Sequence, residues 1–269
     1  MRAPEVLGIV AGNGVYPRLL ADSARKAGVK KLVAAAFSGE TDPALAQYVD
    51  EIEWLRVGQL TRLLNFFRKQ QARQAIMAGQ IAPKNLFDLR PDWKALLLLA
   101  KLKQRNAETI FTAIADELAK VDVDLLPATS FLESYLAPAG LIAGRKLSRR
   151  EEADVDFGWK IAKEIARLDI GQTVIVRNGT VLAVEGFDGT NETIRRGGEL
   201  VRKGAVMIKV AKPNQDMRFD VPVIGLETVR VANAARLRVI ALEAGRTLLL
   251  EREALAEAAT SSNISILAR

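Results

Sequence analysis

The order of apolar and amphipathic stretches in residues 6–37 decides what kind of sheet this chain can build. Val6–Ala11 is an apolar run of strand length, and Lys31–Phe37 is a second one. The stretch between them opens at Gly12, has the spacing of an amphipathic helix and ends at Gly28. Two neighbouring strands joined through a helix run parallel, because the helix returns the chain to the edge of the sheet where it started. The pattern therefore predicts an open α/β unit with a parallel sheet, Rossmann-like in type.

The same alternation continues beyond these first elements. Helices are expected over residues 59–71, 93–103 and 108–120, and strands over 74–79 and 121–126. Residues 128–147 break the pattern, since Pro138 and Gly140 interrupt the apolar runs there. We therefore predict a first domain over residues 1–128 and an irregular linker over 129–147.

A second α/β domain is predicted over residues 148–269. It opens at Ser148, whose spacing to Glu151 is that of a capping box at the start of a helix. Asn178-Gly179 lies between two apolar runs and predicts a β-hairpin, because both residues tolerate positive φ. Further along, the expected elements are a long helix over 226–243, an apolar run over 247–250, a helix over 253–259 and a strand over 264–267. The chain as a whole is expected to be an α/β protein of two domains.

The chain contains no cysteine and no histidine, which removes several kinds of chemistry. Disulfides, thiolate nucleophiles, cysteine–histidine zinc sites and a serine–histidine triad are all excluded. Any general acid–base catalysis must therefore use Asp, Glu, Lys or Tyr side chains. A metal would need oxygen ligands, so Mg²⁺ or Mn²⁺ is the natural candidate.

Composition favours a folded protein that meets anionic partners. The 269 residues are 49% hydrophobic and carry a formal net charge of +7. Such a charge attracts phosphorylated metabolites, anionic lipid headgroups or nucleic acid. No apolar run reaches the length of a membrane span, and the first residues lack the apolar core of a signal peptide. A cytoplasmic location is expected.

The segment Lys209–Gly225 has the most unusual composition in the chain. Two lysines, an arginine and two aspartates fall within twelve of its residues, and apolar runs flank them. Carboxylates that hold a hard metal beside cations that neutralise phosphate oxygens would explain this composition. A solvated loop with paired surface charges is the alternative. In the first case Asp220 and Asp216 are the candidate metal ligands, and three cations are placed to neutralise phosphate oxygens: Lys209, Lys212 and Arg218.

A second polar motif, Val184–Gly198, follows the predicted hairpin. Its glycines Gly186 and Gly189 would let the backbone approach a ligand. Asp188 or Thr190 is placed to cap the helix that follows. A glycine-rich turn that leads into a helix presents free N–H groups and a positive dipole end, which favours an anion. An ordinary capped turn between a strand and a helix would have the same spacing.

The turn Gly12-Asn13-Gly14 after the first strand has part of a dinucleotide-binding motif. The full motif needs a third glycine where Pro17 stands, and no acidic residue cleanly ends the second strand. A turn that holds a phosphate or nucleotide moiety, or one that merely packs tightly, fits better. Two other functional classes remain as alternatives to a metal-dependent enzyme that acts on phosphate groups. They are a nucleotide-dependent transferase or reductase, and a basic nucleic-acid-binding protein. The low aromatic content and the lack of a known module argue against nucleic acid.

Four stretches, taken in order along the whole chain, carry a family resemblance. They are Ile9–Pro17, Ile76–Gly79 with Lys84, Val184–Thr190, and Val210–Gly225 with Glu227-Thr228. Together they resemble the UDP-2,3-diacylglucosamine pyrophosphatases of lipid A synthesis, of the LpxI type. The spacing Gln-Asp-x-Arg-x-Asp-x-Pro in the last stretch is the specific part. Phe187 and Asn191 depart from the residues expected in that family.

The resemblance implies hydrolysis of UDP-2,3-diacylglucosamine to UMP and 2,3-diacylglucosamine 1-phosphate (lipid X), with a divalent cation, in a site between two α/β domains. An essential aspartate of that family best matches Asp220, with Asp216 as the competitor. For such a reaction Asp220 and Asp216 are expected to hold Mg²⁺ or to orient the attacking water. A lipid substrate also implies a peripheral position on the anionic inner-membrane surface. The substrate-binding residues expected are Gly12, Asn13, Gly14, Gly79, Lys84, Gly186, Asp188, Gly189, Thr190, Lys209, Lys212, Gln215 and Arg218. Acyl-chain preference, metal identity, the attacked phosphorus and homo-oligomer formation stay open.

Overall fold

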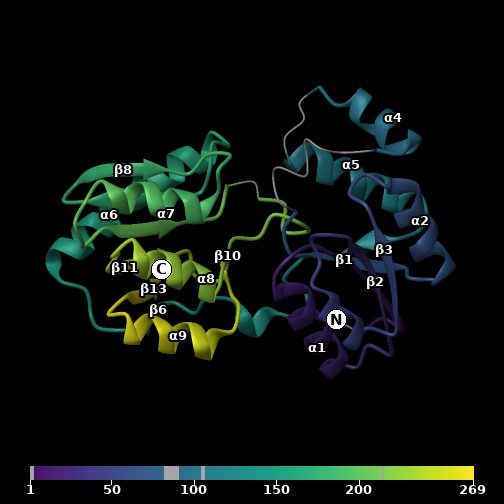
Figure 1. The fold of residues 1–269 in the computed structure, drawn as a ribbon, viewed down its shortest axis with the longest axis horizontal. Coiled ribbons are helices and arrows are strands. Elements are labelled where there is room, and N and C mark those ends of the chain that lie inside the picture. The colour runs from purple at the N-terminus through teal and green to yellow at the C-terminus, as the bar shows by residue number, and fades with distance from the viewer. Residues whose placement is uncertain (1–2, 82–90, 104–106, 214) are drawn as a thin grey trace. The chain divides into compact units, whose positions relative to one another are not determined.

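The chain forms two compact units, and each unit contains segments that are distant in the sequence (Figure 1). The computed structural model describes residues 3–81, 91–103, 107–213 and 215–269. Unit 1 comprises Met1–Leu132 and Asp216–Asp220, and unit 2 comprises Glu133–Gln215 and Val221–Arg269. The short segment Asp216–Asp220 therefore belongs to unit 1, although the residues on both sides of it belong to unit 2.

Unit 1 is built on a parallel sheet of five strands in the order β3-β2-β1-β4-β5, which confirms the predicted parallel α/β architecture. The strands are β1 (Val6–Ala11), β2 (Lys31–Phe37), β3 (Glu51–Leu55), β4 (Gln74–Ala78) and β5 (Asp124–Leu125). The helices are α1 (Tyr16–Lys26), α2 (Leu60–Lys69), α4 (Trp93–Lys101), α5 (Ala107–Ala119) and the short 3₁₀ helix η1 (Pro43–Gln47). The strand order reverses between β1 and β4, and open α/β sheets bind ligands beyond the carboxyl ends of the strands at such a point.

The helices of unit 1 cover its sheet in two layers. The β1–β2 and β3–β4 connections move in opposite directions along the sheet, so right-handed crossovers place α1 and α2 on opposite faces. On the α2 side, Phe67 and Leu118 pack with Val33 and Ala75 in one apolar cluster. The sheet is thus buried on both faces, as expected for parallel strands with continuous apolar sequences.

Unit 2 is built on a mixed sheet of six strands in the order β6-β13-β11-β9-β7-β8. The strands are β6 (Gly140–Ala143), β7 (Thr173–Arg177), β8 (Thr180–Val184), β9 (Val206–Lys209), β11 (Val239–Leu242) and β13 (Ser265–Ala268), and a separate parallel pair consists of β10 (Val223–Ile224) and β12 (Leu248–Leu249). The helices are α6 (Arg149–Arg167), α7 (Thr190–Glu199), α8 (Leu226–Ala234), α9 (Arg252–Ser261) and the 3₁₀ helix η2 (Glu133–Tyr135). Strands β9, β11 and β13 are mutually parallel.

Alternate residues of these strands pack against different helices. Val174 and Ile208 join Val155 of α6 in one cluster. Ile175 and Met207, their immediate neighbours in sequence, join the cluster formed with α7, α8 and α9. Because successive side chains of a strand point to opposite faces, α6 covers one face of the sheet and the other three helices cover the second face.

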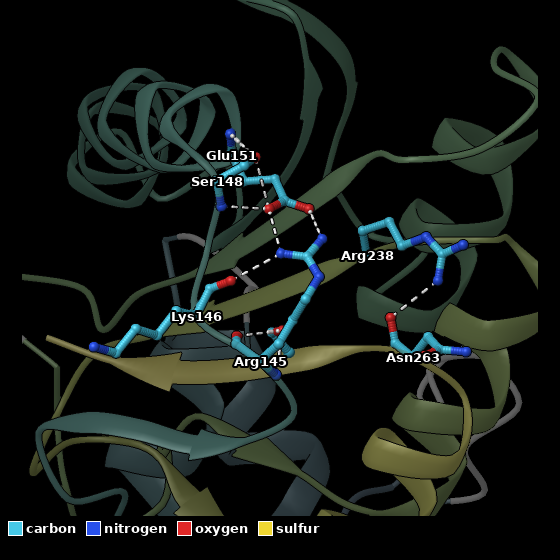
Figure 2. A network of polar contacts seen from close by, with 7 residues as sticks. Arg145, Lys146, Ser148, Glu151, Arg238 and Asn263 are labelled. Carbon is cyan, nitrogen blue, oxygen red and sulfur yellow. Dashed lines mark hydrogen bonds and ion pairs between the residues drawn. The ribbon is translucent and has the colours of Figure 1, made fainter.

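The start of α6 confirms the predicted capping box (Figure 2). The backbone N–H of Ser148 donates to Glu151 Oε2 (2.7 Å), and the N–H of Glu151 donates to Ser148 Oγ (3.4 Å). Arg145 adds two hydrogen bonds to the same carboxylate (2.7 and 2.9 Å). Its carbonyl accepts from Ser265 Oγ (2.8 Å), which ties the start of α6 to β13.

Two expected segments of unit 2 have a different secondary structure. The stretch expected to be an irregular linker contains β6, which pairs antiparallel with β13 at the edge of the second sheet. The long helix expected over 226–243 is wrong: α8 ends at Ala234, and β11 follows after a turn. Arg236 adopts a positive φ of 55°, which stops the helix, and the fully buried run Val239–Leu242 suits a central strand.

Candidate active site

The turns after β1 and β4 lie at the point of unit 1 where the strand order reverses, and they pack backbone against backbone. The N–H of Asn13 donates to the carbonyl of Gln80 (2.7 Å). A Cβ atom on Gly12 would lie 2.5 Å from the same carbonyl oxygen. Gly79 has φ 89°, and a Cβ there would lie 2.5 Å from the carbonyl oxygen of Asn13. Contact between the two turns therefore explains both glycines without a ligand, whereas Gly14 (φ 82°) borders open space.

Tyr16 connects this edge of unit 1 to the chain beyond β5. Its hydroxyl donates to the carbonyl of Ala128, and the N–H of Ala128 donates to the carbonyl of Met217 (2.6 Å). Burial raises the pKa of Tyr16 well above its ordinary value, so the hydroxyl stays a proton donor at neutral pH. Ala128 therefore contacts both Tyr16, which follows the turn after β1, and Met217 of the segment Asp216–Asp220. Sequence reasoning did not single out Tyr16, although it is the first residue of α1.

An aromatic side chain anchors the segment Asp216–Asp220 in unit 1. The ring of Phe219 lies 5.6 Å from the ring of Phe111 in α5 and packs against the apolar cluster of that layer. The carbonyl of Asp216 accepts from the N–H groups of Phe219 (3.2 Å) and Asp220 (3.0 Å), which closes a turn. The polar residues of the motif therefore project from a turn whose apolar member is fixed.

Both carboxylate oxygens of Asp216 accept hydrogen bonds from Arg218 within this turn. Its carboxylate accepts from Arg218 Nε (3.0 and 3.1 Å), from Nη2 (2.6 Å) and from the backbone N–H of the same residue (3.0 Å). The hydrogen bonds from the Arg218 guanidinium lower the pKa of Asp216 below its ordinary value. Asp216 thus orients an arginine, and Asp220 lies four residues further along the same turn.

In unit 2 the predicted residues surround a buried lysine and a buried glutamate. Lys209, at the end of β9, is only 3% exposed, and its Nζ donates to Thr190 Oγ1 (2.6 Å). The Thr190 hydroxyl in turn donates to Glu185 Oε1 (2.7 Å). We call Glu185, Thr190 and Lys209 the buried triad. It joins the end of β9, the residue after β8 and the first residue of α7.

Glu185 keeps its negative charge although its side chain is buried. Burial by itself raises the pKa of this carboxyl. The positive charge of Lys209 opposes that effect, together with hydrogen bonds from the hydroxyls of Thr173 and Thr190 and from the backbone of Gln172, and the net pKa lies below the ordinary value. The lysine that the sequence assigned to phosphate binding is therefore engaged inside unit 2.

The turn that leads into α7 is capped differently from the sequence expectation. Gly189 occupies the N-cap position with φ 80°, and neither Asp188 nor Thr190 makes a side-chain cap bond. Asp188 instead accepts from the N–H of Gly186 (3.1 Å) and from Arg196 Nε (2.9 Å). Thr190 stands one position too late to cap, and its hydroxyl is drawn into the buried triad.

The two remaining predicted residues of unit 2 lie in the chain after β9. Lys212 Nζ lies 2.5 Å from Asp169 Oδ1, and its backbone N–H donates to Gln215 Oε1 (2.7 Å). Gln215 is 9% exposed, and its Nε2 has no hydrogen-bond partner among the described residues. Lys84 lies outside the described part of the chain.

The predicted site residues thus fall into two groups, one in each unit. Unit 1 contains Gly12, Asn13, Gly14, Gly79, Asp216, Arg218 and Asp220, and unit 2 contains Gly186, Asp188, Gly189, Thr190, Lys209, Lys212 and Gln215. Several residues in contact with these were missed, among them Asp169, Glu185 and Arg196. The last two lie inside the motif Val184–Gly198, so the motif itself was the signal that could have found them.

The described residues offer few ligands for a metal ion. No group of three or more acidic side chains converges among them. Asp216, with both oxygens bound by Arg218, does not fit a metal ligand in this conformation. Mg²⁺ usually keeps several waters and binds one or two carboxylates together with substrate phosphates, so of the two predicted metal ligands Asp220 remains a candidate. In the part of the chain that is described, no helix is long and apolar enough to cross a membrane.

Comparison with known proteins matches both units to one family. Residues 6–135 match the LpxI N-terminal domain, and residues 138–267 match the LpxI C-terminal domain. The chain is also similar to the UDP-2,3-diacylglucosamine pyrophosphatase LpxI of Caulobacter vibrioides, with 30% identity over 272 residues that cover 97% of this chain and 96% of that protein. On this evidence the chain belongs to the LpxI family.

Proposed function

We propose that this protein hydrolyses the pyrophosphate bond of UDP-2,3-diacylglucosamine. Water adds to one phosphorus, the bridging P–O bond breaks, and the products are UMP and 2,3-diacylglucosamine 1-phosphate. Membership of the LpxI family supports this substrate and reaction. The observation that carries the assignment to particular residues is the turn Asp216–Asp220, which is anchored at the carboxyl edge of unit 1 and presents an arginine and an aspartate.

In this proposal Arg218 and Asp220 have different roles in the reaction. Arg218, oriented by Asp216, donates hydrogen bonds to the phosphate oxygens as negative charge shifts onto them. Asp220 orients the attacking water or holds the metal. A bound Mg²⁺ or Mn²⁺ would supply charge neutralisation and a water of lowered pKa. Asp216 is then a positioning residue, which refines the sequence expectation that both aspartates act directly.

The first experiment compares Asp220→Asn with Asp216→Asn on the purified full chain. We expect Asp220→Asn to lower kcat by about 10³-fold with little change in KM, because a group acting in the transition state is lost. Asp216→Asn should retain more activity and raise KM, because it only loosens Arg218. UMP release is measured with Mg²⁺, and with EDTA in its place.

The outcomes separate the parts of the proposal. Absence of UMP from the wild-type protein with Mg²⁺ present would reject the reaction itself. Full activity in EDTA would reject the metal, and near-wild-type activity of Asp220→Asn would reject that residue. Hydrolysis in ¹⁸O-labelled water then identifies the attacked phosphorus, since label in UMP means attack on the phosphorus next to uridine.

The diacyl substrate also bears on where the protein works. A lipid with two acyl chains resides in a bilayer, so we propose a cytoplasmic enzyme that is peripheral to the inner membrane. The assignment of the other predicted residues to substrate binding stays a prediction; they are Gly12, Asn13, Gly14, Gly79, Lys84, Gly186, Asp188, Gly189, Thr190, Lys209, Lys212 and Gln215. The formation of a homo-oligomer also stays a prediction.

A further inference from the structure

Helices α7 and α8 of unit 2 border a basic groove that the proposed reaction does not use. The groove has a volume of about 470 Å³, with Val201 and Val231 among its apolar lining. Arg195, Arg230 and Arg236 supply its positive charge. The groove lies on the face of the sheet opposite to α6, because α7 and α8 pack on the other layer.

The positive charge continues from the groove onto the loop after α7. Arg202 and Lys203 are exposed on this loop, and Arg236 Nη1 donates to the carbonyl of Arg202 (3.3 Å), which joins the loop to the groove. Leu200, at the end of α7, is 66% exposed. We call these residues the basic face: Arg195, Leu200, Arg202, Lys203, Arg230 and Arg236.

The acidic residues nearby do not neutralise this face. Arg195 pairs with Glu192 (3.1 Å), Arg230 lies 3.7 Å from Glu227, and Glu199 also borders the groove. These are exposed pairs that salt and water screen. Five cations stand against these three carboxylates, so the face keeps a positive charge.

We propose that the basic face docks unit 2 on an anionic lipid surface. Clustered Lys and Arg side chains are attracted to acidic headgroups, and an exposed leucine among them can enter the boundary between headgroups and acyl chains. Docking of a second copy through the same face is disfavoured, because a two-fold interface would oppose like charges. The proposal rests on the proposed function to the extent that a diacyl substrate gives the enzyme a reason to be at a bilayer.

The test is vesicle flotation of the full chain with phosphatidylcholine vesicles that contain or lack phosphatidylglycerol. The test variant carries Arg202→Glu, Lys203→Glu and Arg230→Glu. A matched control reverses three exposed cations of α6, on the opposite face of the same sheet: Arg149, Arg150 and Lys160, each to Glu.

We expect the wild-type protein to bind the anionic vesicles and to release as salt is raised. The test variant should bind them at least about tenfold more weakly, since each cation near such a surface contributes to binding. The control variant should bind as the wild type does, and Leu200→Ser should weaken binding at every salt concentration. Loss of binding by the control to the same degree as the test variant would overturn the proposal. Equal vesicle binding by wild type and test variant would also overturn it, because the three reversed cations would then contribute nothing.

Activity on detergent-dispersed substrate separates this proposal from the proposed function. The test variant should hydrolyse dispersed substrate at the wild-type rate, because none of its three residues belongs to the reaction. A wild-type protein that hydrolyses dispersed substrate but ignores anionic vesicles would overturn docking alone. One that binds the vesicles but releases no UMP would overturn the function alone. Thermal melts of both variants confirm that they are folded.

Discussion

At the scale of single residues, Lys209 shows how a side chain of catalytic type can serve the fold. Its ammonium group is buried at the end of β9 and reaches Glu185 through the hydroxyl of Thr190. The attraction between two buried charges offsets part of their desolvation cost, but either one left alone is strongly unfavourable. The buried triad therefore holds the start of α7 against β9, and with it the glycine-rich turn.

Removal of Lys209 should lower the stability of the fold more than it changes the rate of the reaction. We expect Lys209→Met to lower the free energy of unfolding by about 3–5 kcal/mol, because Glu185 stays buried without its cation. The double change Lys209→Met with Glu185→Gln should recover most of the loss. Urea unfolding measures both, with the exposed Lys203→Met as a control. Wild-type stability combined with a raised KM would instead mean that Lys209 contacts the substrate.

At the scale of elements, α6 starts from a capping box that Arg145 reinforces (Figure 2). The hydrogen bond from Arg145, with further bonds from Ser148, outweighs burial and lowers the pKa of Glu151 from 4.5 to about 2. Since the pKa is lower in the folded state, the carboxylate stabilises the fold fully above about pH 4.5. That contribution is lost as the pH falls towards about 2.

The pH dependence of unfolding tests this assignment. Glu151→Gln should lower stability at neutral pH by about 1 kcal/mol through the weakened cap, and should make stability less sensitive to pH between about 4.5 and 2. Urea midpoints measured across that range give the comparison. Glu152→Gln, at the exposed neighbouring position, is the matched control. If both variants keep the wild-type pH profile, Glu151 is not the group that titrates.

At the scale of the whole molecule, the chain passes from unit 2 to unit 1 and back within a few residues. The chain leaves unit 2 after Gln215, contributes Asp216–Asp220 to unit 1, and returns to unit 2 at Val221. Phe219 supplies the apolar contact that keeps this segment in unit 1, through Phe111 of α5. The proposed catalytic residues therefore depend on the packing of a unit from which most of their sequence neighbours are absent.

Phe219→Ala tests this arrangement by hydrogen exchange. We expect faster exchange in α5 and in residues 126–132 of unit 1, with little change in β9 and β11 of unit 2. The expected cost is about 1–2 kcal/mol, below that of a fully buried phenylalanine, since Phe219 is only partly buried. Phe187→Ala, at a position 66% exposed in unit 2, serves as the control. Equal changes in both units would contradict the assignment of the segment to unit 1.

Local features and the order of strands and helices were determined by the sequence alone, because each element depends on residues a few positions apart. The capping box of Ser148, the hairpin at Asn178-Gly179 and the parallel sheet that begins with Val6–Ala11 all appear as expected. The capping of α7 was missed, because the Thr190 hydroxyl accepts a hydrogen bond from Lys209, which lies nineteen residues further along the chain. The end of α8 was also missed, since helix spacing continued into what is a buried strand.

The motif Lys209–Gly225 was recognised in the sequence as a candidate site, but its division between two units was not. Spacing shows which residue types are close along the chain, whereas burial depends on which distant surfaces meet. Contact with Phe111 places Phe219, and hence Asp216, Arg218 and Asp220, in unit 1, while Lys209 is enclosed in unit 2. The sequence alone thus determined the elements and the chemical types of the site. Tertiary packing decided which of those charges serve the fold, because only packing brings Glu185 to Lys209 and Arg218 to an anchored turn.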